Sequence, residues 1–327
     1  MKHAAFAVNG PETSDCSLCP NACRIAEGHR GRCRGRGRKN GNLVVHNYGV
    51  IVSAHMDPIE KKPLYHFYPG RSILSVGSYG CNLSCRFCQN CEISQHEVNG
   101  EFIPPQKLAQ SASTIPENLG VAFTYNEPGI SYEYILESAP LIHNLGLKVV
   151  LVTNGYLSDA PWRNLCGCTD AMNIDLKGFT DEFYANICGG KLAPVLKNIQ
   201  SAHEAGVHLE LTNLIVPELN DDPGYFEEMI TWIASLSTEI PLHLSRYFPH
   251  YKENAPPTSP ELLEDFRVRA ARKLKNVFIG NVSPTEANNS CCPDCGQIWV
   301  ERHGYSVHIK SPGTTCTCGR RKSVHGI

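Results

Sequence analysis

The hydrophobic pattern is most regular in the middle of the chain. Between residues 70 and 283, short apolar runs rich in β-branched residues alternate with longer stretches that repeat at helical spacing. This alternation is typical of βα units around a parallel sheet. It predicts seven strands, over residues 72–78, 120–125, 148–153, 171–176, 208–216, 241–247 and 277–282.

Helical patterns lie between these strands. Residues 131–146 form one and close at Gly146, and residues 259–274 form another that opens with Ser259 and Pro260, a frequent helix start. Six or seven βα repeats are too few for a closed eight-stranded barrel. We therefore expect an α/β fold built as an open, partial (β/α)6 barrel, with a doubly wound sheet as the alternative.

Both flanks of this region differ from it in composition. Residues 14–41 are rich in Cys, Gly and Arg, and residues 284–327 lose the alternation and carry CPDCG and CTCG. Segments this short do not build an adequate core unaided. We expect a Cys-rich N-terminal segment with a lead-in to the barrel over 1–69, the barrel over 70–283, and a zinc-ribbon-like domain over 284–327.

Polar clusters stand where the predicted strands end. They read GCN from residue 80, YNEP at 125–128, TNG at 153–155, DLK at 175–177, NLIVPELND at 213–221 and SRYFPHY at 245–251. One such cluster alone is ordinary turn chemistry. Because the C-terminal strand ends of barrels build the active site, six clusters in register predict a site at that edge of the sheet.

Cysteine is the residue whose frequency changes the picture most. Sixteen cysteines in 327 residues, without a long apolar leader, indicate metal-binding thiols in a reducing compartment rather than a disulfide scaffold. No run approaches ~18 consecutive apolar residues, so we expect neither a membrane span nor export and place the protein in the cytoplasm. The net charge of −2 gives no general attraction to nucleic acid.

Four cysteines lie in GCNLSCRFCQNC, residues 80–91, and the number that binds metal decides the chemistry. A cluster held by four thiolates is closed, whereas one held by three leaves an iron open for a ligand. We expect Cys81, Cys85 and Cys88 to hold a 4Fe-4S cluster and assign Cys91 to packing. A fourth ligand at Cys91 and a simple zinc knuckle are the alternatives.

The spacing Cys81-x3-Cys85-x2-Cys88 at a strand end resembles the cysteine motif of the radical SAM superfamily, whose partial barrels bind S-adenosylmethionine (SAM) at the open iron. The resemblance implies an adenine contact at Phe87 and a partner for the SAM ammonium at Glu127. The other cofactor-binding residues that we carry over or place by position are Asn126, Pro128, Thr153, Asn154, Asp175, Lys177, His243 and Arg246. The last two are expected as lining or substrate-binding groups, and a solvent-facing Asp175–Lys177 ion pair is the alternative at that position.

A narrower resemblance covers nearly the whole chain. DPIEKKPLYHFYPG at 57–70, CNLSCRFCQN, TYNEP, VTNGY, NIDLKGF, PLHLSRYFPHY, CSLCPNAC and CPDCG look like the radical SAM component of the AmmeMemoRadiSam system, whose members resemble pyruvate formate-lyase activating enzymes. That family generally has an aromatic residue where this chain has Cys91. The resemblance implies reduced flavodoxin or ferredoxin as electron donor, and protein partners from the same system.

The cysteines of the two ends are expected to bind metals of their own. The N-terminal ligands would be Cys16, Cys19, Cys23 and Cys33, and the C-terminal ligands Cys292, Cys295, Cys316 and Cys318. The N-terminal spacing fits a second iron–sulfur cluster or zinc, because thiolate suits both. The C-terminal spacing resembles a zinc ribbon, in which Cys291 is an alternative ligand.

Three functions compete at this point. The first is reductive cleavage of SAM to a 5'-deoxyadenosyl radical, which abstracts hydrogen from a protein or small molecule. The second keeps SAM chemistry but transfers a 3-amino-3-carboxypropyl group. The third is a nonenzymatic, metal-stapled RNA-binding module that uses HRGRCRGRGRKN at 29–40, although no aromatic residue interrupts that run and a solvated or cluster-flanking loop is favoured.

Overall fold

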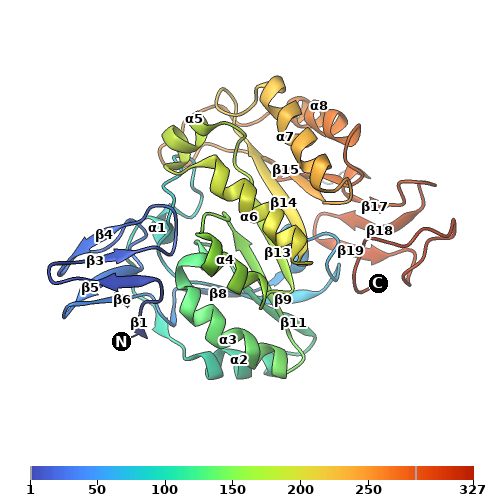
Figure 1. Ribbon diagram of the computed structural model, residues 1–327. Helices are drawn as coiled ribbons and strands as arrows, with labels where there is room; N and C mark the ends of the chain where they lie inside the picture. Colours follow the sequence, from blue (N-terminus) through green and yellow to red (C-terminus); the bar gives the residue numbers. More distant parts are fainter. Residues whose placement is uncertain (1, 284–285) are drawn as a thin grey trace.

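The computed structural model of the protein describes residues 2–283 and 286–327 (Figure 1). Within this part of the chain, the largest sheet has eight strands in the order β16-β15-β14-β13-β12-β11-β9-β8. Its parallel strands are β9 (Ser72–Gly77), β11 (Asn118–Phe123), β12 (Lys148–Thr153), β13 (Ala171–Asp175), β14 (His208–Ile215), β15 (Leu242–Arg246) and β16 (Val277–Gly280). The seven predicted strands are thus confirmed.

The sheet is open, because β16 and β8 stand at its two ends and do not pair with each other. Strand β8 (Ser53–Pro58) runs antiparallel to β9 and was not predicted. The four residues of β8 that precede Asp57 are exposed or half-buried. The strand therefore has no apolar run by which a hydrophobic pattern would reveal it. It lies in the predicted lead-in, and the boundaries at residue 70 and residue 284 stay predictions, the latter lying outside the described residues.

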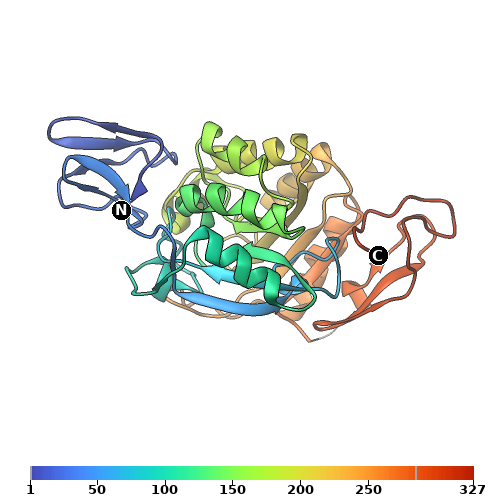
Figure 2. The same ribbon diagram turned by 90° about the horizontal axis from the view of Figure 1, so that it is seen from below.

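Six helices of eight or more residues cover one face of the sheet (Figures 1 and 2). They are α2 (Pro105–Thr114), α3 (Tyr132–Asn144), α4 (Asp159–Cys166), α6 (Leu192–Glu204), α7 (Pro223–Leu236) and α8 (Pro260–Ala271). The predicted start of α8 is confirmed, since the Ser259 hydroxyl accepts from the Leu262 N–H at 3.1 Å and Pro260 follows. Gly146, beyond the end of α3, has a positive φ of 73°.

Short elements connect these parts. They are η1 (Ile59–Lys61), α1 (Cys91–Ser94), η2 (Pro128–Ser131), α5 (Asp181–Phe183), η3 (Tyr184–Cys188), η4 (Glu286–Asn288), and the paired strands β7 (Val50–Ile51) and β10 (Glu101–Phe102). Element η3 is a π-helix, a rare form that occurs often at functional sites.

The two ends of the chain form small sheets on opposite sides of the large one (Figures 1 and 2). The N-terminal sheets contain β1 (Lys2–His3), β6 (Asn42–Val45) and β5 (Arg36–Lys39), and β2 (Ala7–Asn9), β3 (Thr13–Cys16) and β4 (Arg24–Ala26). The C-terminal sheet contains β17 (Ser290–Cys291), β18 (Ile298–His303) and β19 (Ser306–Ile309).

A buried arginine attaches each end to the body of the protein. At the N-terminal end, Arg36 donates to the Glu133 carboxylate of α3 at 2.5 Å. At the C-terminal end, Arg302 of β18 donates to the Tyr65 carbonyl at 2.6 Å, and its Nε lies 3.8 Å from the Glu60 carboxylate. Both guanidinium groups are almost fully buried, so each is held by partners from a distant part of the chain.

The last residues of the chain return to the body. The His325 N–H donates to the His66 carbonyl at 2.8 Å, and the Tyr68 N–H donates to the His325 carbonyl at 3.0 Å. This parallel bridge covers the segment that leads from β8 to β9.

Candidate active site

A cavity of about 720 Å³ opens at the carboxyl ends of the parallel strands. It contains most of the predicted site residues, namely Cys81, Cys85, Cys88, Phe87, Asn126, Glu127, Thr153, Asn154, Asp175, Lys177 and His243. The predicted site edge is where parallel sheets place their ligands. Pro128 and Arg246 do not line this cavity.

The loop that carries the three cysteines is fixed on several sides. Gly80 has a φ of +89°, and a Cβ at this position would lie 2.2 Å from the Cys33 carbonyl oxygen, so only glycine fits. The Asn82 side chain donates to the Tyr156 carbonyl at 2.5 Å. Farther along, the Ser84 N–H donates to the Cys188 carbonyl at 2.8 Å, which docks the loop on the π-helix η3.

The three sulfurs lie in a setting that suits thiolates bound to metal. The Cys81 sulfur accepts from the Leu83 N–H at 3.4 Å and from the Asn154 amide at 3.6 Å, and the Cys88 sulfur lies 3.1 Å from the Ser94 hydroxyl. Burial raises the pKa of the Cys81 thiol, so a bare thiolate there is unfavourable and a bound metal is what keeps such a group deprotonated. Three soft ligands around one cavity therefore fit an iron–sulfur cluster.

Cys91 lies apart from these three cysteines. It begins α1, and its sulfur lies 3.8 Å from Nε2 of His250 rather than in the cavity. Cys91, Glu92 and His250 bring their ligand atoms within 4.8 Å of one another. This placement agrees with three cysteines, and not four, facing the cavity.

Cys188 is a neighbour of the cysteine loop that the sequence did not reveal. It is fully buried at the end of η3, and its thiol forms a side-chain hydrogen bond with Cys85. Its local sequence favours the role of a buried small hydrophobic residue, and nothing there shows that the π-helix brings it beside a residue more than one hundred positions away. Cys188 therefore supports Cys85 from behind the cavity wall.

The YNEP segment positions a buried carboxylate. Glu127 caps η2 by accepting from the Gly129 N–H at 2.8 Å, and it also accepts from the Thr153 hydroxyl at 2.7 Å and the Asn154 N–H at 2.8 Å. Burial raises the pKa of Glu127 to about 7 although these hydrogen bonds oppose the shift. A carboxylate so held presents negative charge to a cationic group in the cavity.

Asn126 joins the YNEP segment to the cysteine loop. Its side-chain oxygen accepts from the Ser78 N–H at 3.0 Å, and its amide donates to the Gly80 carbonyl at 3.0 Å. The residue therefore acts on the position of the loop, in addition to lining the cavity.

Asp175 and Lys177 face the cavity as an ion pair of 3.0 Å. Burial opposes the charge on Lys177, but Asp175 and the Cys85 thiol raise its pKa well above the ordinary value, so the ammonium stays charged. It also lies 5.9 Å from the centre of the Phe87 ring, which stacks on Phe183. The solvent-facing alternative does not describe this pair, since both side chains line the cavity.

Of the two residues predicted at the end of the sixth strand, His243 lines the cavity and Arg246 does not. The ring of His243 lines the cavity, but its Nε2 lies 2.7 Å from the Glu210 carboxylate, which is itself fully buried. Arg246 instead donates to the Thr258 carbonyl at 2.7 Å and stacks its guanidinium over Phe248. His243 is thus available to the cavity through its ring, and Arg246 supports the loop beyond β15.

A second lysine site in the cavity was missed by sequence reasoning. Lys62 lines the cavity and donates to Asp57 at 2.6 Å, and the Tyr125 hydroxyl donates to the same carboxylate at 2.5 Å. Burial opposes ionisation of Asp57, but these hydrogen bonds hold its pKa well below the usual range. Asp57 and Lys62 belong to DPIEKKPLYHFYPG, the segment shared with the resembled family. That resemblance could have pointed to both residues, whereas no local sequence pattern did.

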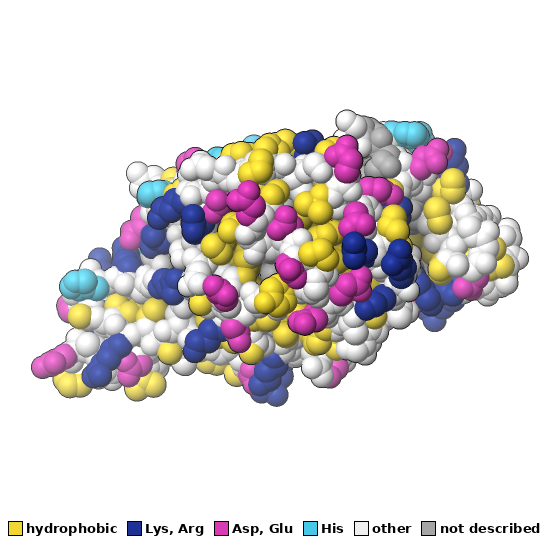
Figure 3. All heavy atoms as spheres, turned by 90° about the horizontal axis from the view of Figure 1, so that it is seen from above, with side chains coloured by type: hydrophobic (Ala, Val, Ile, Leu, Met, Phe, Trp, Pro, Cys, Tyr) yellow, Lys and Arg dark blue, Asp and Glu magenta, His cyan; other side chains and the backbone are white. Residues whose placement is uncertain are grey.

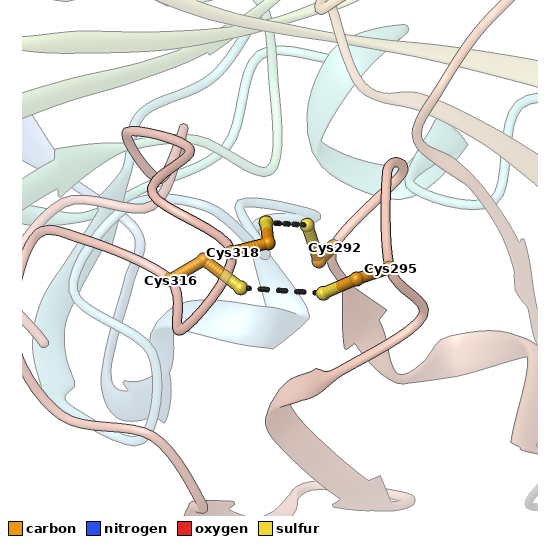
Figure 4. Close-up of side chains that lie close together, drawn as sticks. All are labelled: Cys292, Cys295, Cys316 and Cys318. Atoms are coloured by element: carbon orange, nitrogen blue, oxygen red, sulfur yellow. Dashed lines mark hydrogen bonds between the residues drawn. The ribbon is translucent and has the colours of Figure 1, made fainter.

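The C-terminal sheet also reaches the cavity. Gly304 and Tyr305, in the turn between β18 and β19, line its rim. The sulfurs of the four C-terminal cysteines gather near the segment that precedes β18, whereas this turn follows β18. Cys292 and Cys318 lie at 3.6 Å, and Cys295 and Cys316 at 3.6 Å (Figure 4). Cys291 is not part of this group and contacts the Asn289 carbonyl instead.

Two of the six Arg and Lys residues in the run at 29–40 are buried and support the fold. Arg36 is buried against Glu133, and Arg38, also buried, donates to Glu27 and to the Pro11 carbonyl. Figure 3 shows basic and acidic side chains interspersed on the face drawn there. These placements favour the cluster-flanking loop over an RNA-binding strip.

Comparison with known proteins defines the class. A sequence profile of the Radical SAM superfamily matches residues 75–233. Residues 75–233 therefore match a radical SAM domain, and the protein is an enzyme, so the nonenzymatic alternative is wrong. More particularly, it is 40% identical over 301 residues to an uncharacterized protein of Methanocaldococcus jannaschii, covering 90% of this chain and 89% of that protein.

More distant relatives agree with this class. The chain is 22% identical over 189 residues to the benzylsuccinate synthase activating enzyme of Thauera aromatica, covering 56% of this chain and only 57% of that enzyme. A radical SAM methyltransferase from Sphaerobacter thermophilus has a similar fold, with a TM-score of 0.50, 15% identity and 71% of each chain covered. No helix among the described residues has the length and apolar character needed to cross a bilayer.

Proposed function

We propose that the protein cleaves SAM reductively and uses the resulting radical to abstract hydrogen from a substrate in the 720 Å³ cavity. The single observation that carries the proposal is that three thiols of one loop face a cavity that also contains a buried carboxylate and a buried ammonium. When bound, a 4Fe-4S cluster and SAM supply a 5'-deoxyadenosyl radical. Cys81, Cys85 and Cys88 would hold that cluster.

The remaining residues bind and orient SAM in this proposal. Glu127 accepts the SAM ammonium, whose charge favours ionisation of the buried carboxyl. Lys177 pairs with the SAM carboxylate or with an anionic group of the substrate, and Phe87 packs beside the adenine. Thr153 and Asn154 hold the Glu127 carboxylate in place through hydrogen bonds, so they position the cofactor as well as line the cavity.

Lys62 and His243 mark the substrate side of the cavity. Burial lowers the pKa of Lys62, and its ion pair with Asp57 opposes that shift. His243 presents its ring while Glu210 holds one nitrogen. The Tyr65 ring lies 4.7 Å from the His243 ring, and Tyr65 and Tyr305 also line the cavity. We infer that this side receives the group from which hydrogen is taken, and that it prefers a substrate with an anionic part.

We place the enzyme in the AmmeMemoRadiSam system, as an activating-enzyme-like component. The support is the position of the family's DPIEKKPLYHFYPG segment, whose Lys62 and Tyr65 line the cavity and whose Asp57 pairs with Lys62. The proposed donor is reduced flavodoxin or ferredoxin. The sixteen free cysteines of the chain suit the reducing cytoplasm that we propose as its location.

The test is anaerobic. The cluster is reconstituted and reduced with dithionite, SAM is added, and the adenosine products are identified by mass spectrometry. We expect 5'-deoxyadenosine from the wild type and from Cys91→Ala, and none from Cys85→Ala. Cys91→Ala is the matched control, because Cys91 lies in the next turn of chain but outside the cavity.

Other products contradict the proposal in defined ways. Methylthioadenosine in place of 5'-deoxyadenosine would favour aminocarboxypropyl transfer. Loss of product in Cys91→Ala, with the cluster content reduced, would make Cys91 a ligand. Adding the other proteins of the system should increase product formation, and no increase would argue against that assignment.

A further inference from the structure

The four N-terminal cysteines converge on one small, closed cavity beside the active-site loop. Cys16 ends β3, Cys19 and Cys23 lie in the turn before β4, and Cys33 precedes β5. All four line this cavity, together with Arg36 and other residues of the segment. Three of them are buried and Cys23 is half-buried, so the site is enclosed but reaches the surface at one ligand.

Sulfur spacing distinguishes this site from the C-terminal one. Zinc with four thiolates at about 2.3 Å places them about 3.8 Å apart at the corners of a tetrahedron. The C-terminal sulfurs match this, at 3.6 Å in two pairs and all within 4.8 Å of one another. In residues 2–283 and 286–327, no three N-terminal cysteines meet the 4.8 Å condition, and neither do Cys81, Cys85 and Cys88. By this measure the N-terminal site and the active-site loop both differ from the close sulfur spacing of the C-terminal site.

Backbone N–H groups around the N-terminal site donate hydrogen bonds to cysteine sulfurs, as they do around iron–sulfur clusters. The Cys33 sulfur accepts from the N–H groups of Gly35 and Arg36, and the Cys19 sulfur accepts from the N–H of Asn21. The Arg36 guanidinium lies close enough to Cys33 to act on its charge. Hydrogen bonds to sulfur and a nearby cation are the features by which proteins stabilise iron–sulfur clusters.

The site is joined directly to the active-site loop. The Asn21 side chain donates to the Asn82 carbonyl at 2.7 Å, and the next N–H, that of Leu83, donates to the Cys81 sulfur at 3.4 Å. A chain of hydrogen bonds thus runs from the Cys19 sulfur through Asn21 to the Cys81 sulfur. The Cys33 carbonyl also lies against Gly80, one residue before Cys81.

We propose that Cys16, Cys19, Cys23 and Cys33 bind a second iron–sulfur cluster that relays electrons to the cluster at Cys81, Cys85 and Cys88. A reduced flavodoxin or ferredoxin gives up one electron to the N-terminal cluster, which passes it on and returns to its oxidised state. No bond or proton changes place in this transfer. Half-buried Cys23 provides the entry side for the donor, and exposed Arg32 lies nearby in sequence to attract an acidic one. Arg24 and Arg30 are also near in sequence but pair with Asp15 and Glu97.

The metal is tested without any SAM chemistry. The variant Cys81→Ala/Cys85→Ala/Cys88→Ala is purified anaerobically, and its iron, acid-labile sulfide and zinc are measured. We expect iron and sulfide in equal amounts, lost on adding Cys19→Ala/Cys23→Ala, and about one zinc per chain in both proteins. A second zinc per chain without sulfide, or an empty N-terminal site, would overturn the proposal. This result does not depend on the proposed function.

The relay rests on the proposed function and is tested separately. Reduction of the active-site cluster by reduced flavodoxin is followed by electron paramagnetic resonance in wild type and Cys19→Ala/Cys23→Ala, with dithionite as the small control reductant. We expect the rate with flavodoxin to fall by about tenfold or more, the scale of effects on guided protein encounter, and the rate with dithionite to change little. Equal rates with flavodoxin would overturn the relay.

Loss of ligands in Cys19→Ala/Cys23→Ala could unfold the N-terminal segment. Asn21→Leu is the control for this, because it keeps all four cysteines. It is expected to retain its iron and to slow the flavodoxin reaction while leaving the midpoint of each cluster's reduction unchanged. Unaltered transfer in this variant, with the iron retained, would show that the Asn21 bridge is not the route.

Discussion

The two cysteine-rich ends use the same ligand atoms but hold them at different spacings. At the C-terminal end, four sulfurs gather within 4.8 Å, whereas at the N-terminal end they surround a cavity more widely. Residue type is identical in the two sites, so it does not select the metal. The difference teaches that the surrounding strands and turns, which set the distances between sulfurs, distinguish a site for one ion from a site for a cluster.

The ends also differ in their relation to the active site. The N-terminal site touches the loop of Cys81 through Asn21 and Cys33. At the C-terminal end, the turn that follows β18 lines the cavity with Tyr305, and none of the four cysteines does. One end is thus placed for electron transfer and the other for shaping the cavity.

Exposure to air should produce the largest difference between the two ends, measured as loss of hydrogen-exchange protection. An iron–sulfur cluster is destroyed by oxygen, whereas zinc has no redox chemistry, so residues 2–45 should lose amide hydrogen-exchange protection and residues 290–325 should keep it. Mass-spectrometric hydrogen exchange before and after air treatment measures this. Equal loss at both ends, or none at either, would remove the distinction.

The arginines that attach the ends provide the next comparison. Arg36→Met leaves the Glu133 carboxylate buried without its partner at 2.5 Å and should lower the free energy of unfolding by roughly 3–5 kcal/mol. Arg302→Met should cost less, because its Nε lies 3.8 Å from Glu60 and its closer partner is a carbonyl. Urea unfolding of both variants under one set of anaerobic conditions measures the two costs, and a larger cost for Arg302→Met would reverse the order.

The centre of the protein should respond to pH through Glu127. Because burial raises the pKa of Glu127 from 4.5 to about 7, the folded state binds this proton more tightly than the unfolded state. Stability from this group is present below the unfolded pKa and is lost as pH rises through about 7. In the metal-free protein the free energy of unfolding should fall by up to about 3 kcal/mol over this window. Glu127→Gln should flatten the profile, and an unchanged profile would contradict the assignment.

Exposed ion pairs at the two ends should give the smallest effect. Arg30 pairs with Glu97 at the N-terminal end, and Arg320 pairs with Asp294 at the C-terminal end. All four side chains keep some exposure, so Arg30→Ala and Arg320→Ala should each change the free energy of unfolding by less than about 1 kcal/mol. A calorimetric melting temperature for each variant checks this, and a large drop in either would mean that the pair supports its metal site.

The central sheet could be predicted from sequence because its strands are buried on both faces. All six residues of β11 are buried, which makes an apolar run of the length that parallel strands require. The antiparallel edge strand β8 was missed for the opposite reason, since polar and exposed residues dominate it. Helix ends were predictable where a local signal existed, as with Ser259 and Pro260 at the start of α8.

The candidate site was predictable where spacing in the chain carries the chemistry. The three cysteines of the active-site loop lie within eight positions, so their grouping is local. Contacts between distant segments had no such signal. Tyr125 donates to Asp57 across 68 positions in the chain. Cys188 forms a thiol hydrogen bond with Cys85 because a π-helix, which no periodicity in the sequence indicated, brings the two free cysteines together.

The placement of Tyr305 at the cavity rim has a consequence for the order in which the protein is made. The last strand of the parallel sheet ends at residue 280. The β18–β19 turn that lines the cavity rim, and His325 that contacts residues 66–68, are synthesised after it. During synthesis the nascent sheet therefore exposes an unfinished cavity. If the protein forms the radical that we propose, full control of access to it requires Tyr305 and His325 to be in place.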